Sequence, residues 1–224
     1  MERFSLNKST LSFKMKILIA LVFLFSPILM FSTHVVGGSL TYVYNGGSNY
    51  TITLKLYRDC GPGTAALPGS VTIQIRDVNG NAFSPSKNVT IPLTSVTNIA
   101  ASLDPCAIPP NPSPCVEEAI YTTTVNNLPP NATGYHMYFQ ICCRNGSILN
   151  IVNPGSAGET FYANIPGSSF TPNSDPVFNL FPPLFICVNK PFTFNHSATD
   201  ADGDSLVYSL YQPYNNTAPT FPGG

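Results

Sequence analysis

The chain has 224 residues, of which 43% are apolar and only 9% are charged, and its formal net charge is −1. Its 22 prolines and 16 glycines favour short strands joined by turns over long helices. The apolar fraction is large enough for a hydrophobic core, which excludes general disorder. The scarcity of basic residues excludes nucleic-acid binding, which needs positive charge to neutralise phosphates.

Residues 1–33 have the order of segments that is typical of a secretory signal peptide. Four basic residues precede an apolar run at 17–31, and small polar residues follow it. The run is 15 residues long and contains Pro27, so it is short for a membrane-spanning helix. Removal of the signal leaves six basic and ten acidic residues, a net charge of −4. We therefore expect a secreted, acidic protein with no membrane span after the signal is removed.

The apolar residues after the signal alternate along the chain with a period of two. In 49–60 the apolar residues from Tyr50 to Leu56 share one face with Cys60, and threonine and lysine share the other. The segment 134–144 alternates in the same way. Successive side chains of a strand point to opposite faces, so both segments are predicted to be half-buried strands. Further strands are predicted at 39–44, 71–77, 89–93, 116–125, 161–165 and 192–195.

This number of short strands, separated by turn signals, predicts an all-β fold. The interpretation we favour is an immunoglobulin-like β-sandwich over residues 34–186. A proline-rich loop at 104–115 interrupts the pattern, because proline cannot continue regular structure there. From Cys187 onward a new run of strands and turns begins. Residues 187–224 are therefore predicted to be the incomplete start of a second β-sandwich module.

All six cysteines lie after the signal, which indicates disulfide bonds in an oxidising compartment. Six cysteines allow 15 pairings. Cys142 and Cys143 are adjacent in a predicted strand, so they project to opposite faces and should have different partners. The alternative is a bond between these two neighbours. The pairings that we predict are Cys60–Cys143 across the core, Cys106–Cys115 within the proline-rich loop, and Cys142–Cys187.

An acidic loop at residues 200–204 contains Asp200, Asp202 and Asp204 around Gly203. Alternating carboxylates can converge on calcium, which prefers six to eight oxygen ligands. The loop is not an EF-hand, because Tyr211 stands where that motif needs a bidentate acid. Residues 77–83 repeat the same pattern with Asn-Gly in place of Asp-Gly, and both dipeptides are strong hairpin signals. The loop is predicted to be first a hairpin turn and second a conditional calcium site.

No set of residues predicts a catalytic site. The PGSAG sequence around Ser156 lacks the first glycine of a nucleophile elbow, and the three histidines have no metal-ligand spacing. Glu117 and Glu118 are neighbours in a strand and must face away from each other. Five tyrosines could form a platform for sugars, although packing is the expected use of most of them: Tyr42, Tyr44, Tyr57, Tyr121 and Tyr138.

Several segments together resemble a known group of proteins. They are THVVGGSLTY after the signal, YRDC, CVEEAIYTTTV, YHMYFQICCRN and FICVNKPFTFNHSATDADGDSLVYSL. They are similar to the N-terminal region of large secreted surface proteins of Bacteroidota, often described as gliding-motility-associated or type IX-secreted. The last segment also resembles cadherin-like modules. The resemblance implies display on the cell surface or adhesion.

These observations predict a non-catalytic structural or adhesive module of a secreted bacterial cell-surface protein. The expected partners are neighbouring β-sandwich modules of the same polypeptide, and surface glycans or proteins. The alternative is a carbohydrate-binding module of a larger secreted enzyme. An exposed, coplanar row of tyrosines would favour that alternative, and packed tyrosines would count against it.

Overall fold

The computed structural model describes residues 35–61, 64, 66–81, 87–99, 115–142, 144–146, 148–170, 172–184 and 186–214. The predicted signal peptide, Cys106 and Cys143 lie outside these residues. The described chain is nearly all β and contains no α-helix, which confirms the predicted all-β class. None of its helices is long and apolar enough to cross a membrane.

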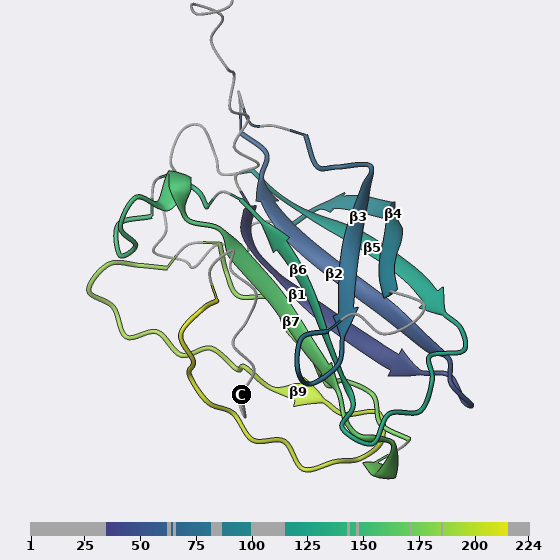
Figure 1. Ribbon diagram of the computed structural model, residues 1–224. Coiled ribbons are helices and arrows are strands. Elements are labelled where there is room, and N and C mark those ends of the chain that lie inside the picture. Colours follow the sequence, from purple (N-terminus) through teal and green to yellow (C-terminus); the bar gives the residue numbers. More distant parts are fainter. Residues whose placement is uncertain are drawn as a thin grey trace, which may run out of the picture. The chain divides into compact units, whose positions relative to one another are not determined.

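Seven antiparallel strands form one sheet (Figure 1). Each strand follows a run of alternating or β-branched residues, and turns rich in glycine, asparagine and proline separate them. In spatial order the strands are β1 (Val35–Tyr44), β2 (Tyr50–Asp59), β5 (Val116–Val125), β4 (Lys87–Asn98), β3 (Ser70–Arg76), β6 (Tyr135–Ile141) and β7 (Glu159–Ile165).

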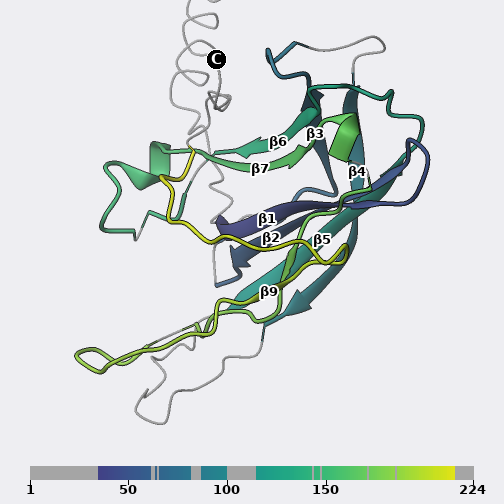
Figure 2. The ribbon, with the colours of Figure 1, turned by 90° about the horizontal axis from the view of Figure 1, so that it is seen from below.

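Strand β4 folds this sheet back on itself. Its first half pairs with β3, up to Pro92, and its second half pairs with β5, from Leu93 onward. An irregularity in the register between Leu93 and Ser95 marks the change of partner. Such bulges bend a strand and increase its twist. As a result β1, β2 and β5 face β3, β6 and β7 in two layers (Figure 2), and the sheet is nearly a closed barrel.

The two outer strands, β1 and β7, approach each other and almost close the barrel. A Cβ atom at Gly38 on β1 would lie 2.8 Å from a ring carbon of Phe161 on β7 and 2.4 Å from the Lys55 carbonyl oxygen. Only a residue without a side chain therefore lets the aromatic ring pack against the β1 backbone.

The core lies between the two layers. In β2 the predicted alternation is confirmed, because Ile52, Leu54 and Leu56 are fully buried and the residues between them are partly exposed. In β6 the prediction of a half-buried strand is wrong for residues 135–139, which are all buried. Both faces of this strand are covered, so the buried side chains include the polar His136.

One disulfide corrects the predicted pairing. Cys60 is bonded to Cys115, and their Cα atoms are 5.0 Å apart. In the pairing of β2 with β5, Asp59 is opposite Val116. Cys60, which follows Asp59, therefore lies opposite Cys115, and its N–H donates to the Cys115 carbonyl. The predictions Cys60–Cys143 and Cys106–Cys115 are therefore wrong. Alternation indicates the face of a strand but not which strand is its neighbour.

The remaining prediction is a bond between Cys142 and Cys187. Each of these two cysteines is disulfide-bonded. Their pairing with each other stays a prediction.

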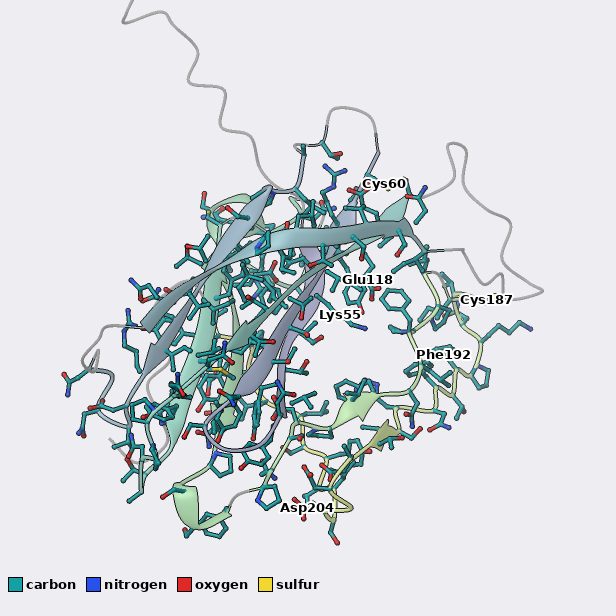
Figure 3. All side chains as sticks on the ribbon, turned by 90° about the vertical axis from the view of Figure 1, so that its right-hand side faces the viewer. Lys55, Cys60, Glu118, Cys187, Phe192 and Asp204 are labelled. Carbon is teal, nitrogen blue, oxygen red and sulfur yellow. A yellow bond between two sulfur atoms is a disulfide. The ribbon has the colours of Figure 1, made fainter. Side chains whose placement is uncertain are left out.

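Residues 176–214, which we call the arm, follow the sheet. Their regular structure is one short ladder between β8 (Val177–Phe178) and β9 (Ala198–Thr199). The strand predicted at 192–195 is wrong, because those residues have no strand partner. Figure 3 shows Lys55 and Glu118 on the sheet, whereas Cys187 and Phe192 lie on the arm.

The arm exposes most of its large apolar side chains. Leu210, Val207 and Val188 are the most exposed of them, at 104%, 93% and 84%. The others are Val177, Phe178, Leu180, Phe181, Ile186, Phe192, Tyr208 and Tyr211. Contiguous exposure of this kind on a folded protein commonly marks an interaction surface.

Candidate functional site

The acidic loop is organised by Asp200. Its Oδ1 atom accepts hydrogen bonds from the backbone N–H groups of Asp202, at 2.9 Å, and Asp204, at 3.0 Å. Gly203 has a φ of 83°, a conformation that glycine adopts without strain. The side chain of the first aspartate thus closes the turn over the next four residues.

The segment 77–83 begins with the same turn. Asp77 Oδ1 accepts from the N–H groups of Asn79, at 2.9 Å, and Asn81, at 2.8 Å, and Gly80 has a φ of 78°. The antiparallel strands β3 and β4 lie on either side of this segment, which confirms the predicted hairpin. The repeated sequence pattern therefore does produce a repeated turn.

The acidic loop differs from that hairpin in its partners. The short strand before the loop, β9, pairs with β8, and the residues that follow the loop up to 214 form no strand. The loop is therefore a turn, as predicted, but it does not join two strands that pair with each other.

Residues 173–175 attach the chain to the edge of the sheet. Asp175 N donates to the Tyr42 carbonyl at 2.9 Å, and Asp175 Oδ2 accepts from Tyr42 N at 3.2 Å. Ser174 Oγ accepts from Tyr44 N at 3.1 Å, and Asn173 Oδ1 accepts from the Tyr42 hydroxyl. These groups satisfy backbone N–H and C=O groups that an edge strand such as β1 otherwise leaves unpaired.

The acidic loop attaches in turn to residues 173–175. Asp202 Oδ2 accepts from the Ser174 N–H, and Asp204 Oδ2 accepts from Asn173 Nδ2 at 3.1 Å. Two of the three aspartates that the sequence singled out therefore hold the arm against the β1 edge.

The carboxylates of Asp175 and of the acidic loop form no ion pair within the described chain. None of the ion pairs between described residues includes Asp175 or an aspartate of the acidic loop. Burial raises the pKa of Asp175 to about 7, the hydrogen bond from Tyr42 N opposes this, and the charge of Asp200 adds to it. Burial, and then the charge of Asp175, raises the pKa of Tyr42. The site thus disfavours further negative charge.

A pocket of about 430 Å³ opens beside this network. It has carboxylate and amide groups on its wall, no lysine or arginine, and the exposed ring of Phe170 at its rim. Its lining residues are Tyr42, Asn164, Pro166, Phe170, Pro172, Asn173, Ser174, Asp175, Pro176, Asp200, Asp204 and Leu206. The carboxylates in this lining disfavour the binding of anions.

The calcium prediction for Asp200, Asp202 and Asp204 stays a prediction. Among the described residues, no group of three or more histidine, cysteine, aspartate or glutamate side chains is arranged to hold a metal ion. In the described arrangement the three carboxylates accept N–H donors from different partners instead of converging. Thermal melting with calcium and with a chelator tests the prediction, since specific binding to the folded state would raise the melting temperature.

The two adjacent glutamates of β5 face opposite sides, as predicted, and both have partners. Glu117 forms an ion pair with Arg58. Glu118 lies 3.7 Å from Lys55 Nζ and accepts a hydrogen bond from the Tyr57 hydroxyl at 3.0 Å. Both carboxylates are thus part of cross-strand contacts between β2 and β5.

A further ion pair joins Glu159 on β7 to Arg144, at 3.2 Å. Burial raises the pKa of Glu159 to about 7, and the charge of Arg144 opposes this. The guanidinium also donates to the carbonyls of Gly158 and Tyr214, at 3.0 and 3.3 Å. Arg144 therefore connects β7 to the last described residue of the arm.

The histidine and serine candidates stay apart. His136 is buried on β6 and hydrogen-bonded to the Tyr162 hydroxyl, and burial lowers its pKa. Ser156 is exposed in a 3-10 turn, Pro154–Ser156. His196 lies on the arm, in contact with Phe178 and Phe194.

The tyrosines do not form an exposed row. Tyr42, Tyr121 and Tyr138 are buried, at 1%, 0% and 6% exposure. Tyr44 packs against Tyr50 in the core, with ring centroids 5.4 Å apart. Tyr57, on β2, packs against Phe181 of the arm. These tyrosines stabilise the fold, which was the expected use of most of them.

Sequence reasoning missed Asn173, Ser174 and Asp175. They lie in a stretch rich in proline and serine, in which the sequence pattern predicts no strand and no site. The signal that could have found them is the short polar run NSD between two prolines, since such side chains often bond to nearby backbone groups. The β1 strand that they contact is 130 or more positions earlier in the sequence.

Comparisons with protein-family models, curated proteins and solved structures found no match to this chain.

Proposed function

We propose that the protein is a non-catalytic structural or adhesive module of a secreted bacterial cell-surface protein. In this proposal, residues 34–186 are an immunoglobulin-like sandwich, and residues 187–224 begin a second, cadherin-like module. The observation that carries the proposal is the contrast between a sheet with a closed core and an arm that exposes its apolar side chains. A rigid body that presents an apolar arm is suited to contact with other proteins or modules.

The ionisable groups of the described sheet support a structural role. Glu117, Glu118 and Glu159 each pair with a basic side chain, and those contacts link neighbouring strands or connect the sheet to the arm. The disulfide between Cys60 and Cys115 joins the end of β2 to the start of β5, which are neighbours in the antiparallel sheet. Such bonds stabilise small extracellular domains.

The carbohydrate-binding alternative loses its main support. Its test was an exposed row of tyrosines, and the tyrosines in question are packed into the core or against the arm. We therefore do not propose it as a second function.

An adhesion assay tests the proposed function. Beads coated with residues 34–224 are expected to be retained on bacterial cells or on their extracellular polymers more than beads coated with the double variant Ile186→Ser/Val188→Ser. Both substitutions are at exposed positions of the arm, so the variant should fold normally, which circular dichroism would check. Equal retention of both kinds of bead, at the level of uncoated beads, would contradict the proposal.

A second experiment tests the localisation. A reporter fused after residue 224 is expected outside the cytoplasm, with the mature N-terminus near residue 33. A reporter that stays in the cytoplasm with an intact N-terminus would contradict secretion.

A further inference from the structure

Residues 205–213 of the arm are an extended segment without a strand partner. Within the described part of the chain, none of their backbone N–H or C=O groups forms a hydrogen bond. Most of their side chains are also open to solvent, with Val207 at 93%, Leu210 at 104% and Tyr211 at 75% exposure. Leu206 is partly buried and lines the pocket, and the Tyr208 hydroxyl accepts a hydrogen bond from Ala198 N at 2.9 Å. Unpaired backbone groups beside apolar side chains are a template for pairing with another strand.

Both ends of this segment are held by the sheet. At the start, Asp204 accepts a hydrogen bond from Asn173, which contacts β1. At the end, the Tyr214 carbonyl accepts from Thr160 N of β7 at 3.3 Å, and the Tyr214 ring packs against Tyr162. Figures 1 and 2 show the segment as a long span that runs from the end of β9 back toward β6 and β7.

This anchoring lowers the cost of binding. A flexible segment loses conformational entropy when it pairs, whereas a segment that is already extended loses less. Residues 205–213 are therefore a preformed strand whose backbone N–H and C=O groups can pair with those of a second strand.

We propose that this strand pairs antiparallel with the same segment of a second copy of the chain, centred on Tyr208. The sequence LVYSL is close to symmetric about that residue. In this register Leu206 of one copy is opposite Leu210 of the other, and the two Tyr208 residues face each other. Between positions 206 and 210, one face of the paired strands is then formed by leucine and tyrosine, and such cross-strand pairs stabilise sheets.

The charges also favour a second copy as the partner. Residues 205–213 contain no charged side chain, so like charges do not meet within the pair. The nearest charge, Asp204, would lie opposite Gln212. A twofold arrangement of identical surfaces is the commonest way in which soluble chains associate. This association is separate from the proposed adhesive function, which the bead assay tests by itself.

Sedimentation of residues 34–224 over a range of concentrations tests the pairing. The expected result is a reversible monomer–dimer equilibrium. Leu210→Asp places a charge on the apolar face and is expected to weaken the dimer about tenfold or more. Val188→Asp is the matched control, because it adds the same charge at an exposed arm position outside the segment and should leave the equilibrium unchanged.

Cross-linking tests the register. With Tyr208→Cys, the two substituted positions face each other at a Cα separation of about 4.5 to 5.5 Å, within the reach of a disulfide. With Leu210→Cys, the two positions are offset by four residues, about 13 Å along the strand, and cannot bond. The first variant should form a covalent dimer and the second should not. A chain that is monomeric at the highest attainable concentration, or equal cross-linking of both variants, would overturn the proposal.

Discussion

Strand β2 and residues 205–213 of the arm are both extended, and both have apolar side chains at alternate positions, from Tyr50 to Leu56 in β2 and from Leu206 to Leu210 in the arm. In β2, Ile52, Leu54 and Leu56 are fully buried, whereas Val207 and Leu210 of the arm are almost fully exposed. The difference is the number of neighbours. β2 has a strand on each side and a second layer of sheet across the core, and the arm segment has neither within the described chain. The same local pattern thus supports stability in one region and leaves a binding surface in the other.

Removal of the Cys60–Cys115 disulfide should have the largest effect on the sheet. The bond spans 55 residues, and a loop of that length corresponds to about 4 kcal/mol of stability in the chain-entropy treatment. We expect the double variant Cys60→Ala/Cys115→Ala to lose about that amount in urea denaturation. A loss below about 1 kcal/mol would show that the bond contributes little to the free energy of unfolding of the sheet.

Leu54→Ala compared with Leu210→Ala tests the contrast directly. The first substitution empties a fully buried position and should cost about 2 to 5 kcal/mol. The second removes the same atoms from an exposed position, so we expect a change within about 0.5 kcal/mol. Denaturation at low protein concentration measures the monomer in both cases. A similar loss for both variants would mean that the arm segment is buried in solution.

Stability should also depend on pH through Asp175, which is hydrogen-bonded to β1 just before the arm begins. Its pKa is about 7 in the folded protein and about 4 in the unfolded chain, so the folded state binds the extra proton between these values. Stability is therefore greatest below about pH 4 and is lost as the pH rises to about 7. Because a pKa difference of one unit corresponds to about 1.4 kcal/mol and Asp175 retains contact with solvent, we expect a loss of about 1 to 2 kcal/mol.

Asp175→Asn isolates this contribution, because the amide oxygen can still accept from Tyr42 N. The variant should be more stable than the native chain at about pH 8 and similar to it at about pH 4. Glu159, whose pKa is also raised to about 7, should retain its own pH dependence in the variant. An unchanged stability profile after the substitution would contradict the assignment to Asp175.

Asp202→Ala should have a smaller effect on stability than removal of the disulfide or of the Leu54 side chain. It removes one hydrogen bond between the acidic loop and Ser174, which is worth about 1 kcal/mol. The expected result is faster hydrogen exchange of the Ser174 amide, with little change in the amides of β2. Asp77→Ala serves as the comparison, since it removes the hydrogen bonds that close the turn after β3 and should leave the arm unaffected. If Ser174 exchanges at the native rate in Asp202→Ala, the loop does not hold the arm.

The sequence predicted local features well. Alternation located β2, β5 and β6, although the burial of both faces of β6 depends on the elements that cover it and could not be read from its own residues. The match between the acidic loop and residues 77–83 correctly predicted the same turn, because an aspartate side chain and a following glycine determine that geometry within five residues.

Pairing between distant segments could not be predicted in this way. Cys60 was assigned to the wrong partner, since the neighbouring strand depends on the topology of the whole sheet. The strand predicted at 192–195 has the right composition but no neighbour. Strand structure depends on hydrogen bonds to another segment and is therefore a tertiary property.

By itself, the sequence determined the all-β class, the position of most strands and the form of the two aspartate turns, because these follow from contacts between residues close in the chain. Only the tertiary structure decided that β4 folds the sheet into a nearly closed barrel, that Cys60 meets Cys115, and that residues 173–175 join the acidic loop to β1. The reason is physical. Each of these features requires contact between segments far apart in sequence. The free energy of forming such contacts depends on all the other strands that pack around them.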